Sequence, residues 1–225
     1  MPLLEVEDLR CSFLTPSGEV RAVDGISFAM EAGESLGVVG ESGSGKTMTA
    51  LSMLRLFGPS STVRLAGSVR FDGIDLLRVN DKTLRTIRGG KIGMVFQDPL
   101  TSLDSVMPVG AQIAESLRLH KGLSRKAANH RAIELLERVG IPNAVHRAKD
   151  LPHRFSGGMR QRIMIAIAIS CEPQLLIADE ATTALDATVQ MQILALLQDL
   201  QRDLGMAMMV ISHDLGVIAA LCETA

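Results

Sequence analysis

Short apolar runs alternate along the chain with longer segments whose apolar residues recur at helical spacing. A helix is predicted over residues 187–204, because apolar residues at 189, 193, 196, 200 and 204 share one face and Gly205 follows. The apolar runs are typical of buried strands and cover residues 35–39, 91–96, 175–178 and 206–212. Strands separated by helices predict an α/β fold with a mainly parallel sheet.

The first third of the chain carries a different pattern. Residues 4–13 partly alternate, which predicts an edge strand, and a turn is expected at residues 15–18. Further strands are expected over residues 25–30 and 68–73, the second running into a tight turn, and residues 58–61 should end the helix between them. These strands predict a small antiparallel sheet beside the main one.

The middle of the chain becomes helical. Helices are predicted over residues 109–120 and 124–139, with Ser124 as N-cap and Gly140 then Pro142 ending the second. A helix over 159–171 follows. We therefore expect one domain over residues 1–225, in which 1–97 and 156–225 form the α/β core and 98–155 a helical subdomain.

A phosphate-binding loop lies between the strand at 35–39 and a helix predicted over 48–56. It fits the pattern G-x-x-x-x-G-K-[ST] at every specified position. Its glycines allow the backbone to approach phosphate oxygens, and the helix N-terminus favours negative charge. The pattern predicts an ATP site with Mg²⁺, in which Lys46 reaches the β- and γ-phosphates and Thr47 binds the metal. The predicted nucleotide-binding residues here are Gly40, Glu41, Ser42, Gly43, Ser44, Gly45, Lys46, Thr47 and Thr49.

Polar residues also follow three other predicted strands, namely Gln97, Asp179 with Glu180, and His213. In parallel sheets ligands bind at the carboxyl edge of the strands. Asp179 is suited to hold Mg²⁺ with Thr47, and Glu180 to polarise an attacking water. Gln97 could contact the metal and that water, and His213 could hydrogen-bond the γ-phosphate or orient Glu180.

A second anion-binding helix start is predicted at Ser156, Gly157 and Gly158. One nucleotide does not need two such loops from one chain. The simplest resolution is a dimer in which this segment covers the γ-phosphate held by the other subunit.

Composition narrows the class of protein. Of the 225 residues 47% are hydrophobic, the formal net charge is −2, and there are six Phe but no Tyr or Trp, which argues against nucleic-acid binding. Three scattered cysteines suggest neither disulfides nor a metal site. We find no apolar run long enough for a membrane span and no signal peptide. If the protein acts at a membrane, we therefore expect it to do so through a partner protein.

These motifs together resemble the nucleotide-binding subunit of an ABC transporter over essentially the whole chain. The phosphate loop looks like a Walker A motif, Gln97 a Q-loop, residues 155–159 an ABC signature, residues 175–180 a Walker B motif, residues 184–186 a D-loop, and His213 the switch histidine. The resemblance implies ATP hydrolysis to ADP and phosphate in a nucleotide-sandwich dimer. It also implies nucleotide contacts from Asp186, and Phe13 is either the adenine-stacking aromatic or a core residue.

Residues 96–103, 155–162 and 178–186 are similar to those of the peptide and nickel importers. That branch implies a homo- or heterodimer of ATPases on the cytoplasmic face of the membrane. It also implies two permeases, a helix of which enters the groove near Gln97 to Leu103, and an extracytoplasmic solute-binding protein. Ala181 stands where the family usually has Pro, and Asp104-Ser105 where it has Asn-Pro.

Two alternatives remain: a soluble ABC ATPase of DNA repair or translation, and a catalytically idle partner that binds ATP structurally. The first is disfavoured by the short spacing between Lys46 and Ser156, and the second by Glu180, Gln97 and His213. Because the family continues well beyond His213, we expect a C-terminally truncated chain.

Overall fold

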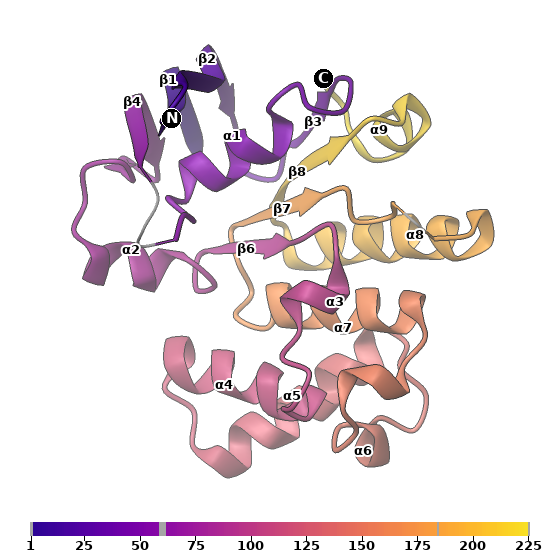
Figure 1. The fold of residues 1–225 in the computed structure, drawn as a ribbon. Helices are drawn as coiled ribbons and strands as arrows, with labels where there is room; N and C mark the ends of the chain where they lie inside the picture. The colour runs from indigo at the N-terminus through magenta and orange to yellow at the C-terminus, as the bar shows by residue number, and fades with distance from the viewer. Residues whose placement is uncertain (1, 59–61, 184, 225) are drawn as a thin grey trace. The chain divides into compact units, whose positions relative to one another are not determined.

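A computed structural model of the protein describes residues 2–58, 62–183 and 185–224 (Figure 1). The chain divides into two units, of which the first comprises the segment up to Arg85 and the segment from Ala207 on, and the second runs from Thr86 to Met206. Of residues 58–61, predicted to end the helix after the phosphate loop, residues 59–61 lie outside the described part of the chain.

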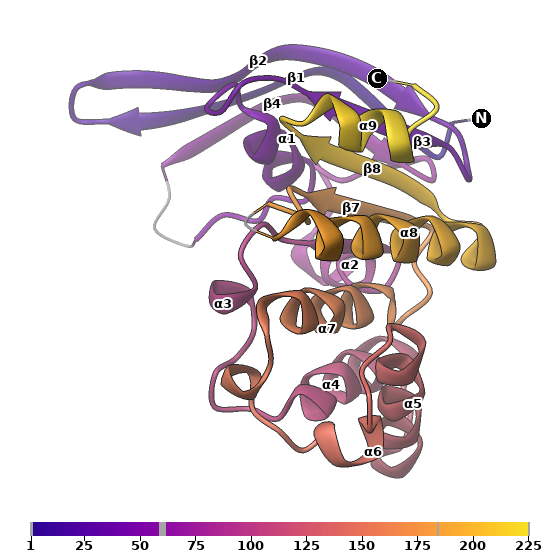
Figure 2. The same cartoon turned by 90° about the vertical axis from the view of Figure 1, so that its right-hand side faces the viewer.

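An antiparallel sheet dominates the first unit, which confirms the small antiparallel sheet predicted for the first third of the chain. Its strands are β1 (Leu4–Thr15), β2 (Gly18–Met30), β4 (Val63–Phe71) and β5 (Ile74–Asp75), in the order β2-β1-β4-β5. Figure 2 shows β1 and β2 as a long hairpin, whose turn lies where the sequence predicts it. The apolar side chains Leu4, Leu9, Met30 and Phe71 are buried under this sheet.

The prediction of β1 as an edge strand is wrong. Strand β1 pairs with β2 on one side and with β4 on the other, so it lies inside the sheet. The alternation of Leu4 and Val6 correctly indicates one buried face. Alternation reports burial of a face and carries no information on how many edges of a strand are paired, which is why the sequence misled here.

Two parallel strands of the first unit lead to the phosphate loop and to His213. Strand β3 (Ser35–Val39) pairs with β8 (Ala207–Ser212), and Val39 stands opposite Ser212 in the register. Helix α1 (Lys46–Met53) follows the loop, and α9 (Leu215–Leu221) follows β8 and packs on both strands. Helix α1 begins two residues earlier than predicted, and the sequence did not predict α9 or α2 (Asp81–Ile87), both of seven residues.

The second unit is built on the parallel pair β6 (Ile92–Val95) and β7 (Leu175–Asp179). Every residue of β7 is buried, as the apolar run Leu175 to Ala178 predicts for its first four residues, and the burial extends to Asp179 at its end. Helix α7 (Gly157–Ile169) packs on β6 and also contacts α4, α5 and α8 (Ala187–Leu204). Figures 1 and 2 both show α7 between β7 and the group formed by α4, α5 and α6.

Residues 98–155, all within the described part of the chain, form helices and connecting loops, without strands. They form α3 (Pro99–Ser102), α4 (Val109–Lys121), α5 (Arg125–Arg138), α6 (Ala144–Arg147) and a 3₁₀ turn at Pro152–Arg154. Ser124 caps α5 as predicted, because its hydroxyl accepts the Ala127 N–H. Helix α8 has the predicted bounds, and its buried residues are Ile193, Leu194, Leu197 and Leu200. The division into a core and a helical subdomain stays a prediction.

Candidate functional site

The phosphate loop makes a tight turn whose geometry requires glycine. Gly45 has a φ of 93°, and a Cβ at this position would lie 2.3 Å from the backbone oxygen of Ala22. A backbone atom cannot swing aside as a side chain can, so any larger residue would displace the loop or β2. Residues 41–44 are exposed, and α1 begins immediately after Gly45.

Lys46 is held against this loop. Its side chain is buried, with 7% exposure, and its Nζ donates to the backbone oxygens of Gly40 at 2.8 Å and Glu41 at 2.7 Å. A longer bond of 3.4 Å reaches the Ser44 hydroxyl. The ammonium therefore lies over the backbone that the pattern assigns to phosphate binding. It adds a fixed positive charge to the partial charge of the α1 N-terminus.

Two threonines lie in the first turn of α1. Thr47 is the second residue of the helix and half-buried. Thr49 donates its hydroxyl to the backbone oxygen of Gly45 at 3.0 Å, so this side chain stabilises the junction between loop and helix. Their predicted contacts to metal and nucleotide stay predictions.

His213 stands at the same end of its strand pair as the phosphate loop. Because Val39 and Ser212 are register partners, the residues that follow them, Gly40 and His213, both leave the carboxyl end of the pair. His213 is exposed, and the next residue, Asp214, caps α9 by accepting the Gly216 N–H at 2.8 Å. The predicted placement of a histidine at this edge is confirmed, and its role stays a prediction.

In the second unit the structure brings Gln97 and Glu180 into contact. Val95 pairs with Ala178, so the residues after β6 and β7 leave the same end of this pair. The Gln97 Nε2 donates to the Glu180 Oε2 at 2.8 Å, and the Thr183 hydroxyl donates to the same oxygen at 3.1 Å. Glu180 has a φ of 45°, an uncommon conformation for a residue with a Cβ. Asp179, the last residue of β7, is 1% exposed.

The predicted second anion loop starts helix α7. Ser156 is exposed and caps the helix, since its hydroxyl accepts the Met159 N–H at 3.4 Å, and Gly157 and Gly158 form the first turn. A Cβ at Gly158 would lie 2.5 Å from the Val189 Cγ1 of α8. Gly158 therefore permits close packing of α7 on α8 in addition to any contact with an anion.

Asp186 has a structural role that the sequence reasoning missed. Its carboxylate accepts the Val189 N–H at 3.0 Å and caps α8. An aspartate directly before a helical pattern is a recognisable N-cap signal. Its predicted nucleotide contact stays a prediction, and Ala184 of the same motif lies outside the described residues.

Phe13 lies on β1 and is half-buried. Its ring meets that of Phe57 edge-on, with the centroids 6.0 Å apart. This contact fixes the orientation of the Phe13 ring, and both earlier interpretations, stacking on adenine and packing in the core, stay open.

A groove of about 310 Å³ adjoins the Gln97–Glu180 pair. Sequence reasoning missed Gln161, which is 2% exposed and whose Nε2 has no hydrogen-bond partner among the described residues. The buried Nε of Arg160 also lacks a hydrogen-bond partner among the described residues. Both are N–H donors, so two of the residues that line the groove carry a buried donor without an acceptor among the described residues. Its lining consists of Gln97, Asp98, Pro99, Leu100, Gly157, Arg160, Gln161, Thr183 and Leu185.

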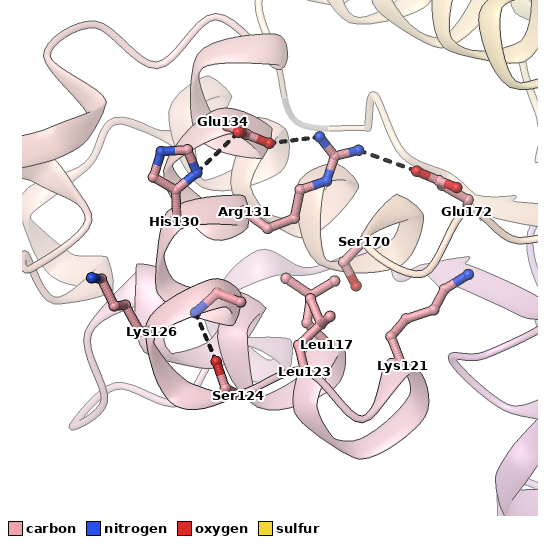
Figure 3. Close-up of a pocket in the computed structure, with 11 residues that line it drawn as sticks. Leu117, Lys121, Leu123, Ser124, Lys126, His130, Arg131, Glu134, Ser170 and Glu172 are labelled. Atoms are coloured by element: carbon pink, nitrogen blue, oxygen red, sulfur yellow. Dashed lines mark hydrogen bonds and ion pairs between the residues drawn. The ribbon is translucent and has the colours of Figure 1, made fainter.

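A larger cavity of about 620 Å³ opens between α4 and α5 (Figure 3). Its polar wall is a chain of contacts: Glu134 forms an ion pair with Arg131 at 2.7 Å, the His130 Nδ1 lies 3.0 Å from the Glu134 Oε1, and Arg131 also reaches Glu172 at 3.1 Å. The hydrogen bond from Arg131 lowers the pKa of Glu134 below its ordinary value. These side chains bind one another, which indicates a structural role.

Within residues 2–58, 62–183 and 185–224 no group of three or more His, Cys, Asp or Glu side chains is arranged to hold a metal ion. None of the helices described is both long enough and apolar enough to cross a membrane.

Comparison with known proteins agrees with this geometry. The oligopeptide transport ATP-binding protein OppD of Salmonella typhimurium is 51% identical over 98% of this chain, and that of Bacillus subtilis 49% over 98%. The chain spans only 65% and 62% of the length of these two relatives. A dimeric ATP-binding cassette solved in a post-hydrolysis state with ADP and Pi matches with a TM-score of 0.84 at 27% identity, over 96% of this chain and 90% of that one.

The family model described as ABC transporter matches residues 23–183. This match and the solved cassette confirm the predicted P-loop α/β fold. The chain belongs to the ABC transporter family.

Proposed function

We propose that this chain is the ATP-hydrolysing subunit of an ABC importer that takes up peptides. The observation that carries the proposal is the complete phosphate loop with Lys46 buried over it. Its relatives are named for oligopeptide transport. The similar solved cassette holds ADP and Pi, the products of the reaction proposed here.

The phosphate loop would bind the triphosphate of ATP. Backbone N–H groups of the loop and of the first turn of α1 are suited to phosphate oxygens, and Lys46 would exchange its bonds to Gly40 and Glu41 for bonds to phosphate. The exchange keeps the ammonium paired in both states.

Mg²⁺ fits the oxygen donors that the motifs supply. Hard divalent cations bound to nucleotides take few protein ligands, usually a hydroxyl and a carboxylate. Thr47 offers the hydroxyl, Asp179 a buried carboxylate, and Gln97 an amide oxygen. When bound, the cation would neutralise charge on the transferred phosphoryl group.

Glu180 is proposed as the base that polarises the attacking water, and His213 as a hydrogen-bonding partner of the γ-phosphate. In the structure the Glu180 carboxylate is fixed by Gln97 and Thr183 at one oxygen. A carboxylate held in this way presents a fixed orientation to a water, which is what positioning requires.

A second ATPase subunit, identical or homologous, is proposed to complete the site. Ser156 is exposed at the start of α7, where it can reach a γ-phosphate held by another subunit. Two solved structures of one similar cassette are dimeric.

The groove beside Gln97 is proposed to receive a permease segment on the cytoplasmic face of the membrane. Leu100, one of its lining residues, is 63% exposed, and the lining residues Gln161 and Arg160 each carry a buried donor without an acceptor among the described residues. A helix end fits both features, because its last carbonyl groups lack partners within the helix. An extracytoplasmic solute-binding protein would supply the cargo, for which the named relatives favour oligopeptides over nickel.

The test is ATP turnover together with oligomeric state. Wild type should hydrolyse ATP slowly, and Glu180→Gln should leave only a small residual turnover and accumulate an ATP-bound dimer in light scattering. Glu137→Gln, at an exposed glutamate of α5, is the matched control. Undiminished turnover in Glu180→Gln removes Glu180 from its role, and retained ATP affinity in Lys46→Ala counts against the phosphate-loop assignment.

A further inference from the structure

We propose that Thr183 is a positioning residue for ATP hydrolysis, which holds the Glu180 carboxylate while Gln97 serves the metal. The inference rests on the proposed function of Glu180 as the base. It concerns a side chain that touches neither nucleotide nor metal in the proposal and acts through Glu180 alone.

The geometry joins Thr183 to Glu180 at two points. The Thr183 hydroxyl donates to the Glu180 Oε2 at 3.1 Å, and the Thr183 backbone N–H donates to the Glu180 backbone oxygen at 3.1 Å. The second bond closes a turn, which keeps the Thr183 side chain within reach of the Glu180 carboxylate. Glu180 itself has a φ of 45°, a conformation that persists only when its surroundings hold it.

The other donor to this oxygen comes from a separate segment. Gln97 is exposed, lies two residues beyond the end of β6, and donates to Oε2 at 2.8 Å. The proposed metal contact uses the other end of the Gln97 amide, its oxygen, so this bond depends on where the segment after β6 is placed. Thr183 lies three residues from Glu180 on the same turn, so its hydrogen bond to the carboxylate does not depend on that segment.

Thr183→Val removes the hydroxyl at nearly constant volume. We expect kcat for ATP hydrolysis to fall about tenfold, since hydrogen bonds to charged groups contribute on that scale. KM and ATP affinity should stay unchanged, because Thr183 does not contact the nucleotide. Thr183→Ser restores the donor and should restore most of kcat. Thr188→Val, at an exposed threonine of α8, is the matched control.

The positioning role also predicts a dependence on Glu180. In a Glu180→Gln background, adding Thr183→Val should cause no further loss of the residual rate, because the group that Thr183 orients is already inactive. Thr183→Ala provides a second hydroxyl-free variant if Thr183→Val does not fold, as judged by its thermal melting.

The outcomes separate the two claims. A wild type that binds ATP and does not hydrolyse it overturns the proposed function. Wild-type turnover combined with full kcat in Thr183→Val and Thr183→Ala overturns only the role of Thr183. Equal losses in Thr183→Ser and Thr183→Val would also overturn it, because the serine hydroxyl should replace that of threonine.

Discussion

Gly158 of α7 and Val189 of α8 lie so close that no Cβ fits at position 158, where it would come within 2.5 Å of the Val189 Cγ1. Valine is stiff at χ1, so its methyl group cannot rotate away cheaply. The start of α7 is therefore positioned by its packing against α8 as well as by its N-cap, Ser156.

Gly158→Ala should lower the free energy of unfolding by about 1–3 kcal/mol, the usual cost of overpacking. Val189→Ala removes the opposing methyl groups, so the double variant should regain part of that loss. Urea denaturation of the wild type, both single variants and the double variant gives the coupling energy. If the two single substitutions change the free energy of unfolding additively, the steric contact between positions 158 and 189 is refuted.

The two loop glycines Gly45 and Gly43 provide a matched pair. Both have positive φ, 93° and 80°, but a Cβ at Gly45 meets the Ala22 backbone oxygen at 2.3 Å while one at Gly43 meets nothing within 4 Å. Gly45→Ala should therefore abolish ATP binding and destabilise the chain. Gly43→Ala should cost only about 1 kcal/mol of backbone strain. Titration with a fluorescent ATP analogue and thermal melting check both, and equal effects would refute the steric argument.

Sequence reasoning succeeded where chemistry is encoded locally. The phosphate loop, the polar residues after four strands and the Ser124 cap depend on residues adjacent in the chain, and the structure places each at the predicted position. Helix α8 was equally clear, because its apolar face and Gly205 lie in one continuous stretch.

What the sequence could not reveal depends on contacts between distant segments. Nothing near Gln161 in the chain indicates that its amide lacks a partner, and the pairing of β1 on both edges depends on β4, whose Phe71 stands opposite Leu4. Asp186 and Thr183 were visible as polar residues, but their hydrogen bonds become apparent only when the backbone turn after β7 is known.

The ion pairs of Glu134 predict a pH dependence of stability. Because the pKa of Glu134 is lowered by its hydrogen bond from Arg131, the carboxylate stabilises the folded chain at pH values above its unfolded pKa of about 4.5. That contribution is lost as the pH falls through the lower folded pKa. The stability difference between wild type and Glu134→Gln should thus vanish in acid and shrink in high salt. Urea midpoints of both proteins, measured from about pH 3 to about pH 7, test this expectation. A stability difference that stays constant over this range would contradict it.

Gln161 and Gln112 predict opposite effects of the same substitution. The Gln161 amide is buried with its Nε2 unused, whereas Gln112 accepts the Asp104 N–H at 3.0 Å and donates to the backbone oxygens of Asp104 and Met107 at 2.9 and 2.8 Å. Gln161→Leu should keep or raise the free energy of unfolding by about 1 kcal/mol, because an unpaired buried donor is costly.

Gln112→Leu should lower the free energy of unfolding by about 1–3 kcal/mol, since it leaves backbone groups of Asp104 and Met107 without their partner. Urea denaturation of both variants measures the contrast, and a loss in Gln161→Leu as large as that in Gln112→Leu would show that the Gln161 amide is paired in solution. If Gln161 instead awaits a carbonyl group of a permease, Gln161→Leu should weaken retention of the chain by its transporter complex. A variant more stable alone and less stable in the complex would identify the groove as a binding surface.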